Sequence, residues 1–271
     1  MISPMDILHI SNTHIEVDSR ILKELKSLSK NKENKILALG IRSRKNVSDN
    51  TSNYKNIRII SVNLFATRLN FLHRNIRQLL TFISFFFKVL MHTRGIKFEV
   101  IHCHDTLVLP IGYLLKKIKK SRLIYDAHEL ESNKNGQSKL MSWCTLFIEK
   151  KCWKSIDLLI SVSESIIKWY QENLGIKKSI LVLNSPEIRK SDLSHNKISS
   201  YRGNYFHKEF NINNSTLIFL YLGFLTKGRG IEKIIDAFDS DQINSHVVFV
   251  GYGNMKDYIL KASKNNRKIH Y

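Results

Sequence analysis

Short apolar runs alternate along the chain with longer stretches in which apolar residues recur at helical spacing. The strand-like runs before residue 186 are residues 7–11, 35–41, 57–62, 100–104, 122–128, 158–163 and 180–184. Between the first two runs, Ile21, Leu22, Leu25 and Leu28 recur on one face of a helix. Nearly continuous apolar strands separated by helices are typical of a parallel sheet covered on both faces. The pattern therefore predicts a doubly wound, Rossmann-like α/β domain over residues 1–185.

The second part of the chain repeats this alternation after a polar interval. Residues 186–215 open with a proline and keep no clean period, so we expect a linker there. Strand-like runs at 216–223 and 246–251 then alternate with helix-like runs at 230–238 and 255–263. We expect a second α/β domain over residues 216–271. It would be incomplete, because a βαβαβ unit of about 55 residues lies at the small limit for a stable domain.

The charge of the chain favours an anionic partner. Lys and Arg number 43 against 23 Asp and Glu, which gives a formal net charge of +20. Nucleic acid, acidic lipid and phosphorylated substrates all fit such an excess. No helix-turn-helix, RRM or zinc-finger signature accompanies it, so we expect no nucleic-acid partner. A basic surface without a specific partner remains an alternative.

Part of the positive charge surrounds an apolar segment. Between Asn50 and Phe98 the sequence has no acidic residue, and residues 79–91 read LLTFISFFFKVLM. This run is shorter than the roughly 20 residues that a transmembrane helix needs. Its basic flanks favour contact with an anionic membrane surface through residues 68–97. A helix buried in the core fits the same pattern, and both interpretations remain open.

The cysteines and the N-terminus bear on the compartment. Cys103, Cys144 and Cys152 form no CxxC pair, which suits a reducing cytoplasm. The N-terminal residues MISPMDILHIS lack the charged and then apolar run of a signal peptide. We expect a cytoplasmic protein, peripheral on the inner face of the membrane.

Polar residues gather where three predicted strands end. They are His102, His104 and Asp105 on one strand, Asp126, His128 and Glu129 on the next, and Ser163 and Glu164 on a third. Ligands of open parallel sheets bind beyond the carboxyl ends of the strands, so these groups predict a binding crevice. Simpler roles remain open, such as a structural histidine or Ser163 as a helix N-cap. No second set of ligands with zinc-type spacing appears, so we expect no metal.

A glycine-rich turn opens the second α/β unit. Gly223, Gly228 and Gly230 let the backbone approach a ligand, while Lys227 and Arg229 bring positive charge to a helix N-terminus. This arrangement suits a phosphate group. It is not a P-loop, because Arg229 and Gly230 stand where that motif needs Lys and then Ser or Thr.

Taken in order, these segments resemble the glycosyltransferases of family 4, which have the GT-B fold. The segments are DSRILKEL, VIHCHDTLVLPIGYLL, RLIYDAHE, IDLLISVSESI, LVLNSPE, LGFLTKGRGIEKIIDAF and VVFVGYGNMKDYI. The resemblance implies two Rossmann-like domains with the active site between them. It also implies an N-terminal domain for the acceptor, a C-terminal domain for a nucleotide-diphosphate sugar, and transfer with retention. No cofactor or metal is expected.

The resemblance assigns roles to several residues. His128 matches the histidine that contacts the donor sugar near the reacting carbon, and Asp105 stands at the family's acidic position. We expect Glu129, together with Asp126, to orient His128. Gly223 matches the glycine that approaches the donor phosphates. The remaining expected donor-binding residues are Arg229, in the position of the cation that stabilises the leaving diphosphate, and Lys227, Ser163 and Glu164.

Three features depart from the family pattern. The first loop, SNTHIEVDSR, lacks the glycine pair of many members, and Phe224 stands where many carry a second arginine. The chain also stops before the E-x₇-E region that holds the donor. We therefore expect a truncated transferase that acts on a lipid-linked or polysaccharide acceptor. The alternative is a non-catalytic remnant or binding module that retains only the acceptor domain.

Overall fold

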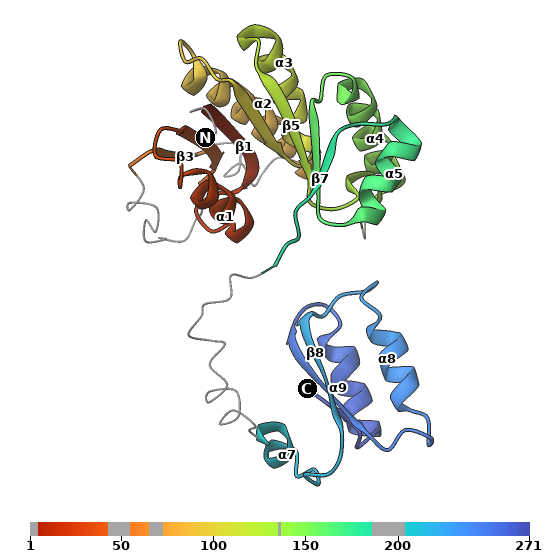
Figure 1. The fold of residues 1–271 in the computed structure, drawn as a ribbon. Coiled ribbons are helices and arrows are strands. Elements are labelled where there is room, and N and C mark those ends of the chain that lie inside the picture. The colour runs from red at the N-terminus through yellow and green to blue at the C-terminus, as the bar shows by residue number, and fades with distance from the viewer. Residues whose placement is uncertain (1–4, 43–54, 65–72, 135–136, 186–203) are drawn as a thin grey trace. The chain divides into compact units, whose positions relative to one another are not determined.

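The computed structural model describes residues 5–42, 55–64, 73–134, 137–185 and 204–271. The chain divides into two compact units, Met1–Ser185 (unit 1) and Pro186–Tyr271 (unit 2) (Figure 1). Most of the expected linker, residues 186–203, lies outside the described residues. Its described end contains a short helix, α7 (Tyr205–Glu209), which the polar sequence did not predict.

Unit 1 contains a seven-stranded parallel sheet in the order β3-β2-β1-β4-β5-β6-β7. Its strands are β1 (Asp6–His14), β2 (Lys35–Ile41), β3 (Ile57–Val62), β4 (Val100–His104), β5 (Arg122–Ala127), β6 (Leu158–Ser161) and β7 (Ser179–Leu181). The chain builds outward from β1 to β3 and then returns to place β4 on the other side of β1. The predicted doubly wound fold is thus confirmed. Its topological switch point, where such sheets bind ligands, lies between β1 and β4.

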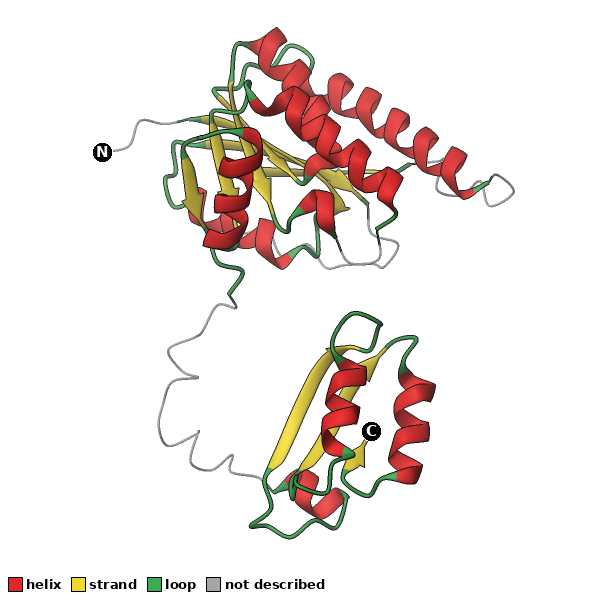
Figure 2. Cartoon of the chain, turned by 90° about the vertical axis from the view of Figure 1, so that its right-hand side faces the viewer, coloured by secondary structure: helices red, strands yellow, loops and turns green. Residues whose placement is uncertain are grey.

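Five α-helices of unit 1 connect these strands. They are α1 (Ser19–Leu28), α2 (Arg74–Thr93), α3 (Leu109–Lys119), α4 (Lys139–Trp153) and α5 (Glu164–Leu174). Because parallel crossovers are right-handed, the change of direction at β1 puts α1 on one face and α2 to α5 on the other. The packing agrees, since Ile21 and Leu25 of α1 join one core cluster and Phe85 and Val89 of α2 join another. Figure 2 shows helices packed against the sheet of unit 1.

Helix α2 combines both interpretations of the apolar run at 79–91. Phe85 and Val89 are buried in the core, as expected of a core helix. On the opposite side Ile83, Phe87 and Met91 are 40%, 63% and 64% exposed. Among the described residues, every helix is too short or too polar to cross a bilayer. Contact of the exposed side with a membrane surface stays a prediction.

Unit 2 confirms the predicted second α/β alternation. It has a parallel sheet in the order β10-β9-β8, with β8 (Ile218–Phe224), β9 (His246–Tyr252) and β10 (Ile269–His270). Helices α8 (Ile231–Phe238) and α9 (Lys256–Asn265) follow β8 and β9. Phe238, Phe249 and Ile259 form part of its core.

A buried carboxyl group fixes the segment that follows β4. Glu149 of α4 is fully buried, and its Oε1 atom accepts hydrogen bonds from Tyr125, Tyr170 and Thr106 at 2.7, 2.6 and 3.1 Å. Thr106 begins a 3₁₀ turn, Thr106–Val108, directly after Asp105. Burial raises the pKa of Glu149, and these hydrogen bonds oppose that shift. The network ties β5, α4 and α5 to the backbone next to Asp105.

This network gives a test of unit 1. Glu149→Leu removes the acceptor of three buried hydroxyl groups, so we expect the free energy of unfolding to fall by about 3 kcal/mol or more. Glu149→Gln keeps an acceptor oxygen and should cost about half as much. The three tryptophans, Trp143, Trp153 and Trp169, all lie in unit 1, so tryptophan fluorescence in urea reports on this unit alone. An equal fall in the free energy of unfolding for the two variants would contradict this role of the Glu149 hydrogen bonds.

Candidate functional site

His102 and His104, which the sequence singled out, lie at the switch point of the sheet together with His9, which it did not. His9 of β1 and His102 of β4 are partners in the strand register, and His104 is the register partner of Asp126 on β5. Alternate residues of a strand point to the same face. The three imidazole rings therefore stack on the α1 side, with centroids 4.3 to 5.3 Å apart.

The buried carboxylate of Asp126 lies at the centre of this cluster. Its Oδ1 atom accepts a hydrogen bond from Nη2 of Arg20 at 2.7 Å. Its Oδ2 atom lies 3.1 Å from Nε2 of His128, 3.4 Å from Nδ1 of His104 and 3.6 Å from Nε2 of His102. Burial alone would raise the pKa of Asp126, but the hydrogen bond from His128 and the nearby imidazoles of His102 and His104 hold it far below its usual range. The side chain is thus an anion that accepts from several donors.

Helix α1 supplies the balancing charges. Asp18 caps the helix by accepting from the backbone N–H groups of Arg20 and Ile21, which fixes the first turn. Arg20 then reaches Asp126, and its Nε atom lies 3.3 Å from Glu24 one turn further on. Burial raises the pKa of Glu24 to about 7. The sequence reasoning missed both Arg20 and Glu24, because they precede Asp126 by about a hundred residues.

His9 and His104 are electrically neutral. Burial, together with the neighbouring histidines, lowers the pKa of His104 to about 3 and that of His9 well below its usual value. Nδ1 of His9 and Nε2 of His104 lie 3.0 Å apart, so one ring donates its hydrogen to the other. A chain of polar contacts therefore runs from β1 to β5 without accumulating positive charge.

His128 is the member of the cluster that reaches solvent. It follows β5, and its side chain is 18% exposed. Burial opposes its protonation, but the hydrogen bond to Asp126 and the charges of Asp126 and Asp105 outweigh that effect, so the pKa of His128 is raised. Nε2 faces Asp126, whereas Nδ1 lies 3.7 Å from Oδ1 of Asp105. The ring is held between two carboxylates.

Asp105 adopts a strained backbone conformation. Its φ and ψ angles are 70° and 161°, a region that residues with a side chain rarely occupy. Its N–H group donates to the carbonyl oxygen of Asp126 at 3.0 Å, which holds it beside β5. Such strain costs about 1–3 kcal/mol and is concentrated at functional sites. The observation singles out Asp105 independently of any sequence motif.

Glu131 is a further acid of this site that the sequence reasoning missed. It is only 4% exposed, and Nζ of Lys134 lies 2.8 Å from its Oε1 atom. Burial and the charge of Asp105 raise its pKa to about 7. Glu129 was expected beside His128, but its side chain is exposed, and Asp105 occupies the position next to Nδ1. In the segment HELES, residues 128–132, nothing in the sequence distinguished the buried Glu131 from the exposed Glu129.

The third predicted cluster has a local structural role. Ser163 is the N-cap of α5, and its Oγ atom accepts from the N–H group of Ile166 at 3.3 Å. Glu164 is exposed in the first turn of the same helix. Donor binding by these two residues stays a prediction.

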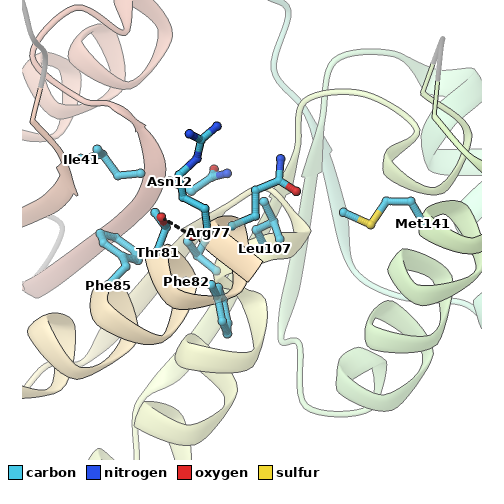
Figure 3. A pocket seen from close by; sticks show the side chains of 10 residues that line it. Asn12, Ile41, Arg77, Thr81, Phe82, Phe85, Leu107 and Met141 are labelled. Atoms are coloured by element: carbon cyan, nitrogen blue, oxygen red, sulfur yellow. Dashed lines mark hydrogen bonds between the residues drawn. The ribbon is translucent and has the colours of Figure 1, made fainter. Parts of the chain in front are cut away.

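A largely apolar pocket opens beside this site, on the other face of the sheet. Its volume is about 570 Å³, within the range of small-molecule sites. The lining residues come from the ends of β1 and β2 and from α2, the 3₁₀ turn and α4; they are Asn12, Ile41, Arg77, Gln78, Thr81, Phe82, Phe85, Leu107, Val108 and Met141 (Figure 3). Leu107 follows Asp105 by two residues. The pocket thus begins where the strained segment ends.

Two groups of side chains have the composition of metal sites. They are His9, Glu24, His102 and His104, and His104, Asp126 and His128. Spacing along the chain did not reveal them, because their members come from separate elements. Arg20 already neutralises part of their negative charge. The expectation that no metal takes part stays a prediction.

In unit 2 the glycine-rich turn lies between β8 and α8. A side chain at Gly251 would place its Cβ atom 1.8 Å from the carbonyl oxygen of Gly223, so close packing of β8 and β9 requires glycine there. Gly230 has a φ of 78° at the start of α8, and Lys227 and Arg229 are exposed. The turn therefore presents two cations near a helix N-terminus, as a phosphate site requires.

Comparisons with known proteins agree with this fold. A curated relative, an uncharacterized glycosyltransferase of Methanocaldococcus jannaschii, is 24% identical over 170 residues, which cover 60% of this chain and 42% of the relative. Sucrose-phosphate synthase of Thermosynechococcus elongatus superposes with a TM-score of 0.69 at 15% identity, covering 98% of this chain and 70% of that one. HepE of Anabaena in complex with UDP-glucose superposes with a TM-score of 0.60 at 14% identity, and the match covers 98% of this chain and 68% of HepE.

At such identities the solved structures show a common fold, here that of GT-B glycosyltransferases. The family model described as Glycosyltransferase Family 4 matches residues 48–184, which contain Asp105, Asp126 and His128. This match covers just over half of the chain, and the chain belongs to glycosyltransferase family 4.

Proposed function

We propose that this chain takes part in transferring a sugar from a nucleotide-diphosphate donor to an acceptor hydroxyl group, with retention of configuration. The observation that carries the proposal is His128, held between Asp126 and Asp105 at the switch point of a family 4 fold. The HepE structures contain UDP and UDP-glucose, which supports a nucleotide-sugar donor.

In the proposed reaction, the bond between the anomeric carbon and the diphosphate oxygen breaks, and its electron pair leaves with the nucleotide. The acceptor oxygen forms the new bond on the same face of the sugar, and its proton passes to the leaving phosphate. His128 orients the sugar by a hydrogen bond from its imidazole. Arg229, Lys227 and the N–H groups after Gly223 bind the diphosphate, whose growing negative charge they stabilise most in the transition state.

The acceptor is proposed to be lipid-linked or a growing polysaccharide. The apolar pocket next to Asp105 and the exposed side of α2 support an acceptor with a hydrocarbon part. A peripheral position on the cytoplasmic side of a membrane would give access to such a substrate. Neither a metal nor another cofactor has a part in this proposal.

Substitution of His128 tests the catalytic assignment. Loss of a hydrogen bond from a charged donor should lower kcat for His128→Ala by about 10- to 100-fold. The measurement is release of free nucleotide from a panel of nucleotide sugars. His14→Asn, an exposed histidine at the end of β1, is the matched control and should keep full activity. A wild-type chain that binds donor without releasing nucleotide would favour a binding module instead.

The pH dependence of the histidines tests the electrostatics. By NMR, we expect His128 to titrate above its ordinary value of 6.5, and His9 and His104 to stay neutral from about pH 5 to 8. Because folding raises the pKa of His128, its protonation stabilises the fold fully below about 6.5, and this contribution disappears as the pH rises through the raised value. The signal of His128 is assigned with His128→Asn. Titration of His104 near pH 6.5 would show that water reaches the cluster and that burial does not lower its pKa.

The backbone conformation of Asp105 is expected to lower the stability of the fold. Glycine tolerates a positive φ, so Asp105→Gly should unfold with about 1 kcal/mol more free energy than Asp105→Ala. Both variants remove the carboxylate beside His128, so the rate of nucleotide release should fall by a similar factor in each. Urea unfolding followed by tryptophan fluorescence measures the difference. If the alanine variant is the more stable, the backbone at 105 is not strained.

A further inference from the structure

The helices on one face of unit 1 have an unusual charge pattern. Among α2, α3 and α4 the only acidic residue is Glu149, and its side chain is fully buried. The basic residues of the same helices are Arg74, Arg77, Lys88, Lys116, Lys117, Lys119, Lys139, Lys150 and Lys151. Helix α5, the next on this face, carries Glu164 and Glu172. The turn after α4 adds one exposed acid, Asp157, which pairs with Lys116 of α3 at 2.6 Å. The acid-poor surface therefore ends at α4.

The same helices expose large apolar side chains. On α2 they are Ile76, Leu79, Leu80, Ile83, Phe87 and Met91; on α3, Ile118; and on α4, Leu140, Met141, Trp143 and Phe147. Trp143 and Phe147 stack, with ring centroids 5.6 Å apart, and Nζ of Lys151 lies 5.5 Å from the Phe147 ring. Monomeric proteins rarely expose so many apolar groups on neighbouring elements unless these groups meet a partner.

This combination fits a lipid surface better than it fits another protein. Apolar side chains bordered by lysine and arginine are typical of elements that lie in the headgroup region of an anionic bilayer. Tryptophan prefers that interface, because its ring is apolar and its N–H group is polar. A second copy of this surface would bring two acid-poor, positively charged faces together, which is electrostatically unfavourable.

The apolar pocket opens within this surface. Phe82 and Thr81 of α2, Leu107 of the 3₁₀ turn and Met141 of α4 line it, and Leu107 and Met141 are themselves exposed (Figure 3). Arg77 lies at the same pocket and brings positive charge to it. An apolar lining with a cation suits a molecule that has a hydrocarbon chain and an anionic head group.

We infer that α2, α3 and α4 form a membrane-docking face that lies on an anionic bilayer, and that the pocket takes the hydrocarbon chain of the acceptor from this bilayer. The identity of the acceptor rests on the proposed function, whereas the docking does not. Sequence alone pointed only to the region of α2. The contributions of α3 and α4 follow from the fold.

The test uses the whole chain with vesicles of phosphatidylglycerol and phosphatidylcholine, some of them carrying brominated acyl chains. Bromine quenches tryptophan at short range, and Trp143 is 63% exposed whereas Trp153 is 5% exposed. We expect brominated vesicles to quench the wild type and to have little effect on Trp143→Phe. Quenching should require phosphatidylglycerol and weaken when the salt rises from about 0.05 to 0.5 M, because salt screens exposed charges.

Variants of exposed residues then locate the surface. The double variant Ile83→Gln, Phe87→Gln should lower vesicle partitioning at least tenfold, and Leu140→Gln should lower it too. Ile176→Gln is the matched control, because Ile176 is 93% exposed and lies outside the three helices. Circular dichroism confirms that each variant is folded.

Three results would overturn the docking. They are absence of vesicle binding, an equal loss of vesicle partitioning in the Ile176→Gln control, or a lipid-free dimer that the double variant abolishes.

For the pocket, Leu107→Glu should raise KM for a lipid-linked acceptor and leave KM for its water-soluble head group unchanged. An equal rise of KM for the lipid-linked acceptor and for its head group would show that the pocket does not bind the hydrocarbon chain. Transfer to a soluble acceptor without vesicle binding would refute the docking alone, and vesicle binding without transfer would refute the proposed function alone.

Discussion

The ion pair between Arg20 and Asp126 is the constraint on which the site depends. Both side chains are buried, so removing either partner leaves a buried charge without its nearest counter-charge, at a cost of about 3–5 kcal/mol. The pair joins α1 to β5 across the sheet, and the histidines of β1 and β4 pack beside it. Because Asp126 is a fixed anion, it can hold His128 in one orientation. The position of the imidazole is thus decided by a residue of the first helix.

The segment after β4 is held both by the sheet and by the helices that cover it. In the plane of the sheet the N–H group of Asp105 donates to the backbone of Asp126, and on the face covered by α4 Thr106 donates to Glu149. These two contacts explain how Asp105 keeps its unfavourable φ angle, since neighbouring residues cannot relax without breaking a buried hydrogen bond. The strain is therefore maintained by Glu149, an acid that lies far from solvent. Its effect reaches the site through the backbone.

Much of the fold could be predicted from the sequence, because it depends on local patterns. The runs at 35–41, 57–62 and 100–104 coincide with β2, β3 and β4. The signal is clearest for β2, because a strand buried on both faces is apolar nearly throughout. The polar ends of β4 and β5 were also identified, and the sheet brings them together. Arg20, Glu24 and Glu131 could not be identified in this way. Their contacts arise from the order of strands and from one helix turn, which no local period encodes.

Positive and negative charge are unevenly distributed within unit 1. Around His128 lie the acids Asp105, Asp126 and Glu131, and in the described part of the chain their ion pairs with permanently charged groups are made by Arg20 and Lys134. A group of carboxylates disfavours an anion and suits hydroxyl groups, which can donate hydrogen bonds to carboxylates. The cations suited to phosphate are instead Lys227 and Arg229 of unit 2. The large positive charge of the chain is therefore not a property of the site around His128, and in unit 1 much of it lies on α2, α3 and α4, away from this carboxylate cluster.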